Sequence, residues 1–426
     1  MENWEMSVRF EDSAAVDSLL VDSSLYASHD RYHDLFRYLR EREPVRMTRP
    51  DGFVPFWTVS RYADICEVQR QPALFINEPR NTLLPIAVEE RLECELGSKL
   101  IMNTMLSMDG AEHQSMRRLG AQYFTPGGVA KLKDGFRRAA NHYVDRMADQ
   151  GSSCDFVQTV SAWYPLRVIL QVFGLDESTD HELHLRTREF INSQNPALSA
   201  EGKQGEKMLK SWNEFCDYFR PLVADRRANP QNDLASVIAN ATFDGDPITD
   251  RRLFSYYILI VVAGHDTTST SLGGGMLQLL RDRTQFDRLK ADPALIPTAV
   301  DEMIRWMAPV KHFLRTATQD YELRGMRISA GETLLMALPS GCYDEEVFDR
   351  PFVFDVARKP NKHIAFGFGA HVCLGQYLAR LELATFLEVF LERIEDMDLC
   401  GTPEESSTLF LGNVDYLPVS YKFKDR

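Results

Sequence analysis

A run of eight consecutive apolar residues, Tyr256 to Ala263 (YYILIVVA), most constrains the fold of this chain. Its length and its β-branched side chains fit a buried strand as well as a buried helix. The flanking residues favour a helix, because Thr249 and Asp250 are typical of a helix start and no breaker precedes Gly264. We expect one helix of about 30 residues. Because it is apolar nearly all round, it must run through the centre of the protein.

Two further stretches repeat apolar residues at the spacing of one helix face. One lies between Pro297 and Pro309, where the two prolines fit the ends of a helix. The other runs from Leu383 to Ile394. These patterns predict a mainly α fold.

Strands are expected to be minor and to lie late in the chain. The segment Tyr321–Ser340 has short apolar runs broken by Gly325 and Gly331, which is typical of a small hairpin-type sheet. No internal repeat, low-complexity run or Pro/Gly/Ser-rich linker marks a domain boundary. We therefore expect residues 1–426 to form a single domain, with residues 1–30 as a flexible N-terminal segment.

Composition limits which partners the protein can bind and indicates the cellular compartment in which it functions. The chain has 62 Asp and Glu against 48 Lys and Arg, a net charge of -14, which argues against nucleic-acid binding. The N-terminus has no basic start and no apolar stretch near the roughly 20 residues of a membrane span, so we expect no secretion signal and no membrane anchor. Seven cysteines without a C-x-x-C pair indicate a reducing cytoplasm and exclude a thiolate zinc site.

The segment FGFGAHVCLG, Phe366 to Gly375, combines three glycines with one histidine and one cysteine. A dinucleotide-binding G-x-G-x-x-G fails here, because Val372 stands at the third glycine. A cysteine nucleophile would use His371 as its base, but residues two apart rarely point at each other. A buried structural cysteine in a glycine-rich loop stays open.

The remaining interpretation is that the thiolate of Cys373 binds a metal centre. Gly367 and Gly369 would let the loop pass close to a flat cofactor while its N–H groups stabilise the sulfur charge. Gly375 would let the following helix begin against that cofactor. The positive end of this helix would further favour the thiolate.

A second motif, AGHDTT, lies inside the expected central helix from Ala263 to Thr268. An acid and two hydroxyls are costly in a buried helix unless they have a function. Thr267 lies one turn beyond Ala263, so its hydroxyl could open a groove and deliver a proton there. Alternatively, Asp266 caps a helix break and Thr267 bonds back to the carbonyl of Ala263. We discount a pairing of His265 with Asp266, because adjacent helical residues diverge by about 100°.

Taken together, these motifs resemble the cytochromes P450, the haem-thiolate monooxygenases. FGFGAHVCLG matches the family's cysteine loop at every defining position, AGHDTT resembles its oxygen-activating motif, and EMIR, Glu302 to Arg305, resembles its E-x-x-R helix. The three occur in the family's order and spacing. Two longer segments resemble one branch of the family, the bacterial terpineol monooxygenases. They are DPALIPTAVDEMIRWMAPVKHFLRTA and AGHDTTSTSLGGG.

The resemblance implies a cytochrome P450 fold, with haem b (iron protoporphyrin IX) between the central helix and the cysteine loop. A large helical lobe and a smaller β-containing lobe would enclose it. Cys373 would be the axial iron ligand, shielded by Phe366, while Asp266 and Thr267 would relay protons to dioxygen. The cofactor-binding residues that the resemblance implies are His113, Arg117, Ala263, Gly264, Thr267, Arg315, Phe366, Gly367, His371, Cys373 and Gly375.

The two haem propionates require cations. His113 and Arg117 are four residues apart, so they share a helix face and match the family's pair. By the same resemblance, Arg315 and His371 complete the set.

Other positions resemble the family's structural features or depart from them. Glu302 and Arg305 resemble its structural ion pair, with Arg358 as the third member. Cys342 and Tyr343 stand where the family usually has Asn-Arg, so a contact near the late sheet must be made differently. The run Gly273–Gly275 predicts close packing of another helix against the central helix, with a hinge as the alternative.

The activity implied is insertion of one atom of dioxygen into a C–H bond. The chain is too short to include a flavin reductase, so we expect electrons from a ferredoxin and its reductase. That partner would dock on a basic cluster made of Arg118, Lys131, Lys133, Arg137 and Arg138. A non-catalytic haem-thiolate sensor is the alternative class, but it would not need a proton relay.

The substrate expected is a small to medium hydrophobic compound of monoterpene or alkyl-aromatic type, with a steroid or fatty acid as the alternative. The pocket positions implied by the family are Leu259, Val262, Val310 and Phe313.

Overall fold

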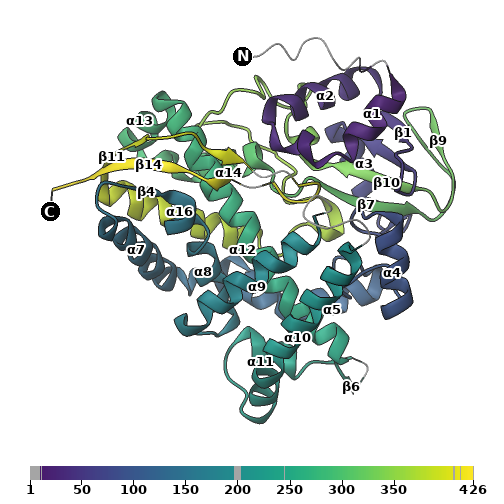
Figure 1. Ribbon diagram of the computed structural model, residues 1–426, viewed down its shortest axis with the longest axis horizontal. Helices are drawn as coiled ribbons and strands as arrows, with labels where there is room; N and C mark the ends of the chain where they lie inside the picture. The colour runs from purple at the N-terminus through teal and green to yellow at the C-terminus, as the bar shows by residue number, and fades with distance from the viewer. Residues whose placement is uncertain are drawn as a thin grey trace.

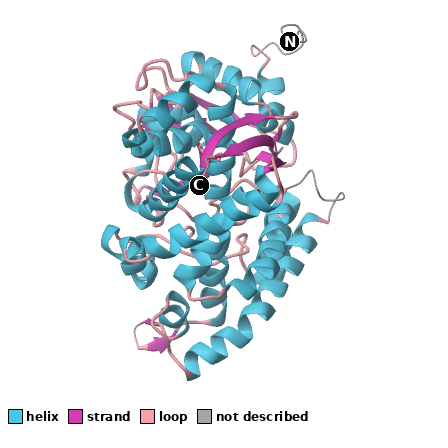
Figure 2. Cartoon of the chain, turned by 90° about the vertical axis from the view of Figure 1, so that its left-hand side faces the viewer, coloured by secondary structure: helices cyan, strands magenta, loops and turns pink. Residues whose placement is uncertain are grey.

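The computed structural model describes residue 10 and residues 12–195, 203–243, 245–405, 408–412 and 414–425. Helices make up most of the molecule, and apart from the short β5–β6 hairpin the strands gather in its upper part (Figure 2). The N-terminal helices pack with the largest sheet in a smaller lobe, and the other helices form the larger lobe (Figure 1). This arrangement agrees with the mainly α, two-lobed fold expected from the sequence.

The bounds of the helices define the scaffold around the site. They are α1 (Ser13–Leu20), α2 (His29–Arg42), α3 (Tyr62–Gln69), α4 (Ile86–Leu96), α5 (Gly110–Phe124), α6 (Pro126–Ala130), α7 (Lys133–Asp149), α8 (Tyr164–Phe173), α9 (Asp180–Ser193), α10 (Gln204–Ala228), α11 (Leu234–Ala239), α12 (Asp250–Arg281), α13 (Arg283–Ala291), α14 (Ile296–Met307), α15 (Leu338–Cys342) and α16 (Gln376–Arg393). Helices α12, α14 and α16 confirm the three helices predicted from apolar periodicity.

Helix α12 is the central helix of the molecule, 32 residues long and buried along most of its length. It packs between α8 and α14 (Figure 1). A Cβ added at Gly274 or Gly275 would lie 2.2 Å from the side chain of Met307 or Met303, both on α14. The predicted close packing at the glycine run is therefore confirmed, because these glycines let α14 lie directly against the backbone of α12.

The largest sheet has five strands in the order β1-β2-β10-β7-β3, with β2 and β10 parallel and the other pairs antiparallel. Its strands are β1 (Val45–Thr48), β2 (Phe56–Val59), β10 (Thr333–Ala337), β7 (His312–Ala317) and β3 (Phe75–Ile76). The expectation that strands lie late in the chain is wrong for β1, β2 and β3, because these short early strands pair with the late ones.

The smaller sheets lie at other edges of the fold. They are β11-β14-β4 (Ile394–Leu399, Pro418–Phe423, Ser153–Asp155), β8-β9 (Tyr321–Leu323, Met326–Ile328), β5-β6 (Thr242–Phe243, Asp246–Pro247) and β12-β13 (Glu404–Glu405, Val414–Tyr416). The β8–β9 hairpin confirms the one predicted within Tyr321–Ser340. It turns through Arg324 and Gly325, which both have positive φ angles.

The N-terminal segment is more ordered than expected. Residues 1–9 and 11 of the expected flexible segment, 1–30, lie outside the described residues, but α1 already begins at Ser13. Val16, Leu20 and Leu25 are at most 2% exposed and pack in a second core with α2. The expectation of a flexible segment is wrong from α1 onward, because burial of these apolar side chains anchors it.

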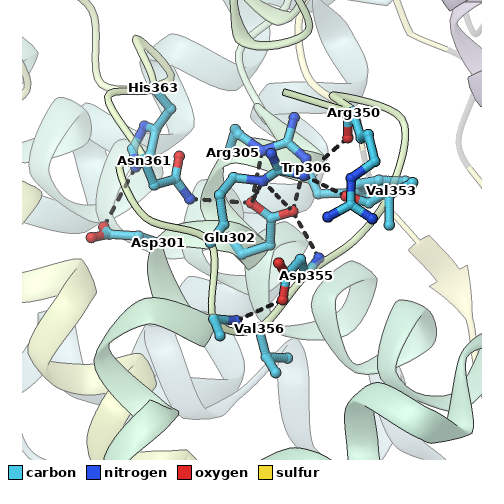
Figure 3. A network of polar contacts seen from close by, with 12 residues as sticks. Asp301, Glu302, Arg305, Trp306, Arg350, Val353, Asp355, Val356, Asn361 and His363 are labelled. Carbon is cyan, nitrogen blue, oxygen red and sulfur yellow. Dashed lines mark hydrogen bonds and ion pairs between the residues drawn. The ribbon is translucent and has the colours of Figure 1, made fainter. Parts of the chain in front are cut away.

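Glu302 on α14 is the centre of a buried polar network (Figure 3). Arg305 donates to both carboxylate oxygens at 2.7 and 2.8 Å, and Arg358 donates to both at 3.0 and 3.1 Å. The amide of Asn361 and the backbone N–H of Asp355 also donate to this carboxylate. The network ties the segment that precedes the cysteine loop to α14, as expected for a structural group.

The unusual pair Cys342–Tyr343 completes this network by other means. The backbone carbonyl of Cys342 accepts a hydrogen bond from Arg305 at 2.9 Å. The hydroxyl of Tyr343 donates to the carbonyl of Trp306 at 2.8 Å and contacts His29 Nε2 at 3.0 Å. A main-chain contact and a tyrosine therefore connect this segment to the E-x-x-R helix.

Candidate active site

The cysteine loop forms one wall of an internal cavity. Gly367 and Gly369 have φ angles of 74° and 73°, which residues with a Cβ rarely adopt. A Cβ at Gly369 would also lie 2.2 Å from the carbonyl oxygen of Gln69, so the loop passes directly against α3. The N–H of Cys373 donates to the carbonyl of Phe366 at 2.8 Å and closes the loop. Backbone geometry therefore sets where the thiol lies.

The environment of Cys373 combines burial with positive charge. Burial raises the pKa of its thiol above the ordinary value, whereas the backbone N–H of Gly375 and the charges of Arg117 and Arg380 oppose that rise. Helix α16 begins directly after Gly375. Of the seven cysteines, all unpaired, Cys373 is the one that lines the cavity. This placement fits a sulfur that becomes a thiolate on binding a cation.

The cavity encloses about 1210 Å³ free of protein atoms, including its opening to solvent. Its walls bring together the cofactor-binding positions expected from the sequence, with two exceptions, Arg315 and Gly367, which do not line it. The lining residues include His113, Arg117, Ala263, Gly264, Thr267, Phe366, His371, Cys373 and Gly375. Arg315, on β7, is only 4% exposed, and its charge contributes to lowering the pKa values of His113 and His371.

Helix α12 forms the opposite wall. A Cβ at Gly264 would lie 2.6 Å from Ile169 on α8, so α8 packs closely against α12 here. The hydroxyl of Thr267 donates to the carbonyl of Ala263 at 2.8 Å, which is the back-bonding considered as the alternative for this motif. The helix is nevertheless unbroken, and Ala263, Gly264 and Thr267 all line the cavity opposite Cys373.

Asp266 faces away from this cavity. It lines a second, smaller cavity together with His184, Arg188 and Asp415, and its Oδ2 has no hydrogen-bond partner in the part of the chain that the structure describes. Burial raises its pKa to about 7, while the charge of Arg188 lowers it and that of Asp415 raises it. Asp266 and Thr267 therefore lie between two cavities rather than side by side in one, because adjacent helical residues diverge.

His265 is a structural residue of α12. Its Nε2 lies 2.7 Å from the carbonyl of Ala162, and its Nδ1 lies 3.2 Å from the hydroxyl of Thr187. Burial lowers its pKa to about 4, so it is neutral at physiological pH. These contacts fix the rotation of α12, and with it the directions in which Asp266 and Thr267 point.

Three cationic or ionisable side chains line one edge of the cavity, His113, Arg117 and His371, and Arg315 lies near enough behind them for its charge to act on both histidines. The rings of His113 and His371 lie 4.0 Å apart, and Arg117 donates to the carbonyl of Val372 at 2.7 Å. Burial and the charges of His371 and Arg117 lower the pKa of His113 to about 4. Burial lowers the pKa of Arg315 to about 10.

This edge fits a flat cofactor that carries acidic groups. His113 Nε2 is buried without a hydrogen-bond partner among the described residues, and Arg315 has no ion pair among them. His113 is neutral at physiological pH because its pKa is about 4, whereas Arg315 is a buried cation whose guanidinium donates to the carbonyl of Leu314 at 2.7 Å. A buried cation without a counter-ion is costly unless an anion joins it. A thiol on one wall, a close-packed helix on the other, and hydrogen-bond donors and arginines without counter-ions at or near the edge fit a haem with two propionates.

Glu382 is a cavity residue that sequence reasoning missed. It lies on α16, nine residues after Cys373, and is 1% exposed. Its Oε2 has no hydrogen-bond partner in the described ranges, and burial raises its pKa well above the ordinary value, against a hydrogen bond from Thr268. The signal was an acid within the apolar stripe of the last helix, where a charge is costly.

The apolar part of the lining differs in one position from the expected pocket. Leu259, Val310 and Phe313 line the cavity, but Val262 does not. Val262 is 9% exposed and does not face the cavity, whereas Ile260, two residues earlier on α12, lies in the wall instead. The rotation of α12 about its axis, set by packing, decides this point. Met105 and Leu106, in the segment before α5, add further apolar surface.

The expected basic cluster on α5 to α7 is partly neutralised. Lys133 lies 3.2 Å from Glu388 on α16, and Arg137 pairs with Glu388 and Glu392. Within the described ranges, no ion pair is formed by the exposed residues Arg118, Lys131 and Arg138. The cations available to an acidic partner are therefore these three rather than five.

Across the described ranges, no helix has both the length and the hydropathy needed to cross a membrane.

Comparison with known proteins gives consistent matches over most of the chain. A family model described as Cytochrome P450 matches residues 89–405. Cytochrome P450-terp of a Pseudomonas species is 36% identical over 405 residues, 93% of this chain and 95% of that protein. Steroid C26-monooxygenase of Mycobacterium tuberculosis is 34% identical over 418 residues, with 96% and 98% covered. The crystal structure of CYP108D1 from Novosphingobium aromaticivorans is similar with a TM-score of 0.89 at 36% identity, covering 96% and 99%.

Proposed function

The chain belongs to the cytochrome P450 family of haem-thiolate monooxygenases, and within it we propose a hydroxylase of monoterpene-type or alkyl-aromatic compounds that receives electrons from a ferredoxin and its reductase. One observation carries the site: a single cavity has the Cys373 thiol on one wall, Thr267 on the other, and Arg117 with the unpartnered Nε2 of His113 at its edge. The cofactor proposed is haem b, and the compartment proposed is the cytoplasm.

The residues proposed to hold the haem are those of the two walls and the edge. Cys373 would bind the iron, with Phe366 packed beside it and the guanidinium of Arg380 lying 4.6 Å from the Phe366 ring. His113, Arg117, Arg315 and His371 would bind the propionates. A bound haem supplies the reductive activation of dioxygen, with the thiolate donating the electron density that favours O–O cleavage.

The proton relay that we propose passes from one cavity to the other through α12. Asp266, whose pKa of about 7 lets it take up and release a proton near neutral pH, receives protons on the solvent side. Thr267 holds a hydroxyl on the cavity side, one residue further along the helix. A relay of this kind favours an enzyme over a non-catalytic sensor, because a sensor delivers no protons.

The walls around the open part of the cavity support a compact hydrophobic substrate. Leu259, Val310, Phe313, Met105 and Leu106 present apolar side chains, and we propose that substrate affinity comes mainly from burying apolar surface. The sequence similarity to the terpineol monooxygenase branch supports the monoterpene class. A steroid is the second candidate, because a relative of similar identity is a steroid C26-monooxygenase.

A ligand screen tests this proposal. Purified protein is reconstituted with haem and titrated with monoterpenes, alkylbenzenes, steroids and fatty acids while the haem absorption is recorded. We expect monoterpenes or alkylbenzenes to produce the low-spin to high-spin shift and, with a ferredoxin and its reductase, a hydroxylated product. A shift with steroids alone would favour the second candidate, and binding without product would favour a sensor.

A further inference from the structure

His371 is held by two residues that no sequence motif singled out, Asn77 and Asp109. The side-chain nitrogen of Asn77 lies 2.8 Å from His371 Nε2 and 2.7 Å from Asp109 Oδ1. The other oxygen of Asp109 accepts the backbone N–H of Asn77 at 2.8 Å. Asp109 Oδ1 itself lies 3.7 Å from His371 Nε2, beyond hydrogen-bond distance. The imidazole is therefore bound through the amide and not directly by the acid.

This arrangement determines which nitrogen of His371 carries the proton. An ionised carboxylate only accepts hydrogen bonds, so the amide of Asn77 must turn its NH₂ group toward Asp109. The second hydrogen of that NH₂ group then points at His371 Nε2, which must accept it. A neutral imidazole that accepts at Nε2 carries its proton at Nδ1. Among the described residues no partner is seen for Nδ1, and the ring lines the cavity.

The same two residues also join the other groups at this edge. Asp109 stands directly before α5, the helix that carries His113 and Arg117. Asn77 directly follows β3, whose Ile76 pairs with Thr316, the neighbour of Arg315 on β7. The contact between Asn77 and Asp109 thus links the loop, the helix and the strand from which the three edge residues and Arg315 come.

We propose that Asp109 and Asn77 are positioning residues that lock His371 in the tautomer with a donor at Nδ1, directed at an acidic group of the bound haem. The inference rests on the proposed haem site, and it adds a specific requirement to that site. A ring free to adopt the other tautomer would turn a lone pair toward the propionate. It would then repel the group that it is placed to bind.

A charge-swapped pair of substitutions separates this role from simple packing. In the double variant Asn77→Asp, Asp109→Asn, an amide at 109 donates to a carboxylate at 77. That carboxylate can only accept a hydrogen bond, so His371 Nε2 must donate one to it. In a neutral imidazole all contacts can re-form only with the proton at Nε2, and Nδ1 then becomes an acceptor; haem loss is therefore compared at a pH where the ring of the variant is neutral. The single variants Asn77→Ala and Asp109→Asn each remove the hydrogen bonds that fix the tautomer of His371. The control variant Glu112→Gln removes a carboxylate from the first turn of α5 and leaves those hydrogen bonds in place.

Haem transfer from the ferric holoenzyme to excess apomyoglobin measures the effect independently of catalysis. We expect haem loss to be about tenfold faster in the single variants and in the swapped variant, because one charge-assisted hydrogen bond is lost. Glu112→Gln should lose haem as slowly as the wild type. Equal rates of haem loss in the wild type and the swapped variant would overturn the proposal.

A spectroscopic measurement needs no variant. In the ferrous carbon-monoxide form, which is diamagnetic, ¹⁵N NMR of histidine-labelled wild-type protein should show His371 protonated at Nδ1. Protonation at Nε2 would overturn the inference even if every variant failed to fold. Failure of the haem site itself would be seen differently, as a wild-type protein that takes up no haem.

Discussion

The two walls of the cavity are built on different physical principles. On the proximal side, the position of Cys373 follows from its own loop, in which two glycines with positive φ angles and one main-chain hydrogen bond define the path. On the distal side, Thr267 and Asp266 belong to a regular helix, and their backbone conformation is ordinary. What places them is the rotation of α12, held by His265 and by the contact of Gly264 with Ile169.

This difference separates residues whose role is local from residues whose role depends on packing. A loop residue such as Cys373 keeps its direction as long as the loop keeps its glycines. Neighbouring helix residues such as Asp266 and Thr267 instead face two different cavities, because adjacent helical residues diverge by about 100°, so the rotation of α12 about its axis decides which of them reaches the haem side. Substitutions can therefore break each wall separately.

The largest effect is expected for Cys373→Ala, which removes the proximal wall's one functional atom. The reduced carbon-monoxide spectrum typical of thiolate ligation should disappear, and product formation should cease. Absorption spectroscopy of the reduced, carbon-monoxide-treated protein checks this. The exposed cysteines Cys94 and Cys400 supply matched controls, whose alanine variants should keep the spectrum. A retained thiolate spectrum in Cys373→Ala would contradict the assignment.

The second largest effect is expected for Thr267→Ala on the distal wall. A positioned proton donor contributes roughly 10²–10⁴-fold, so product formation should fall at least about tenfold while electron consumption continues. The lost electrons should appear as hydrogen peroxide, measured against NADH consumed. Thr267→Ser keeps the hydroxyl and should retain most of the product yield. Full product yield in the alanine variant would argue against the relay.

A smaller effect, on stability, is expected for Asp266→Asn. The native Asp266 keeps its proton up to a pH of about 7, whereas an unfolded Asp releases it near pH 4. Because the native state binds more protons in that interval, its free energy of unfolding falls as pH rises from about 4 to about 7, by at most ~1.4 kcal/mol per pH unit. In the Asp266→Asn variant this contribution to the pH dependence of the free energy of unfolding should be absent.

Urea unfolding of both proteins between pH 5 and pH 8 tests that slope. Asp349→Asn, at an exposed carboxylate, should run parallel to the wild type and serves as the control. Parallel curves for wild type and Asp266→Asn would mean that Asp266 does not titrate in this interval.

The smallest effect is expected outside both walls, at the proposed electron-donor surface. Reversing the exposed, unpaired cations with Arg118→Glu and Arg138→Glu should slow first-electron transfer from a ferredoxin several-fold at low salt, with less difference at high salt. Stopped-flow reduction of the haem under carbon monoxide measures it. Arg42→Glu, an exposed reversal on α2 in the other lobe, should leave the rate unchanged. Equal rates in all variants would place the partner elsewhere.

Much of the fold was predictable from periodicity. The central helix, the E-x-x-R helix and the helix after Cys373 were found because long amphipathic or fully apolar patterns define them. The early strands were missed because β1 and β2 have only four residues each and gain their stability by pairing with β10, far along the chain. The order of α1 was missed because its few apolar residues form a core only with α2 and the sheet.

Residue types and their spacing in the sequence were enough to select the candidate site residues. Cys373 with its glycines, the AGHDTT motif and the three edge residues with Arg315 are defined by residue type and local spacing, which translate directly into backbone conformation. Only the tertiary structure decided what each of them faces. Packing directs Asp266 toward a second cavity and places Ile260, not Val262, in the wall of the first. It also pairs Lys133 and Arg137 with acids of α16 and brings Asn77 and Asp109 against His371. The physical reason is that helix rotation and ion pairing depend on partners distant in sequence, whose contacts exist only once the chain has packed.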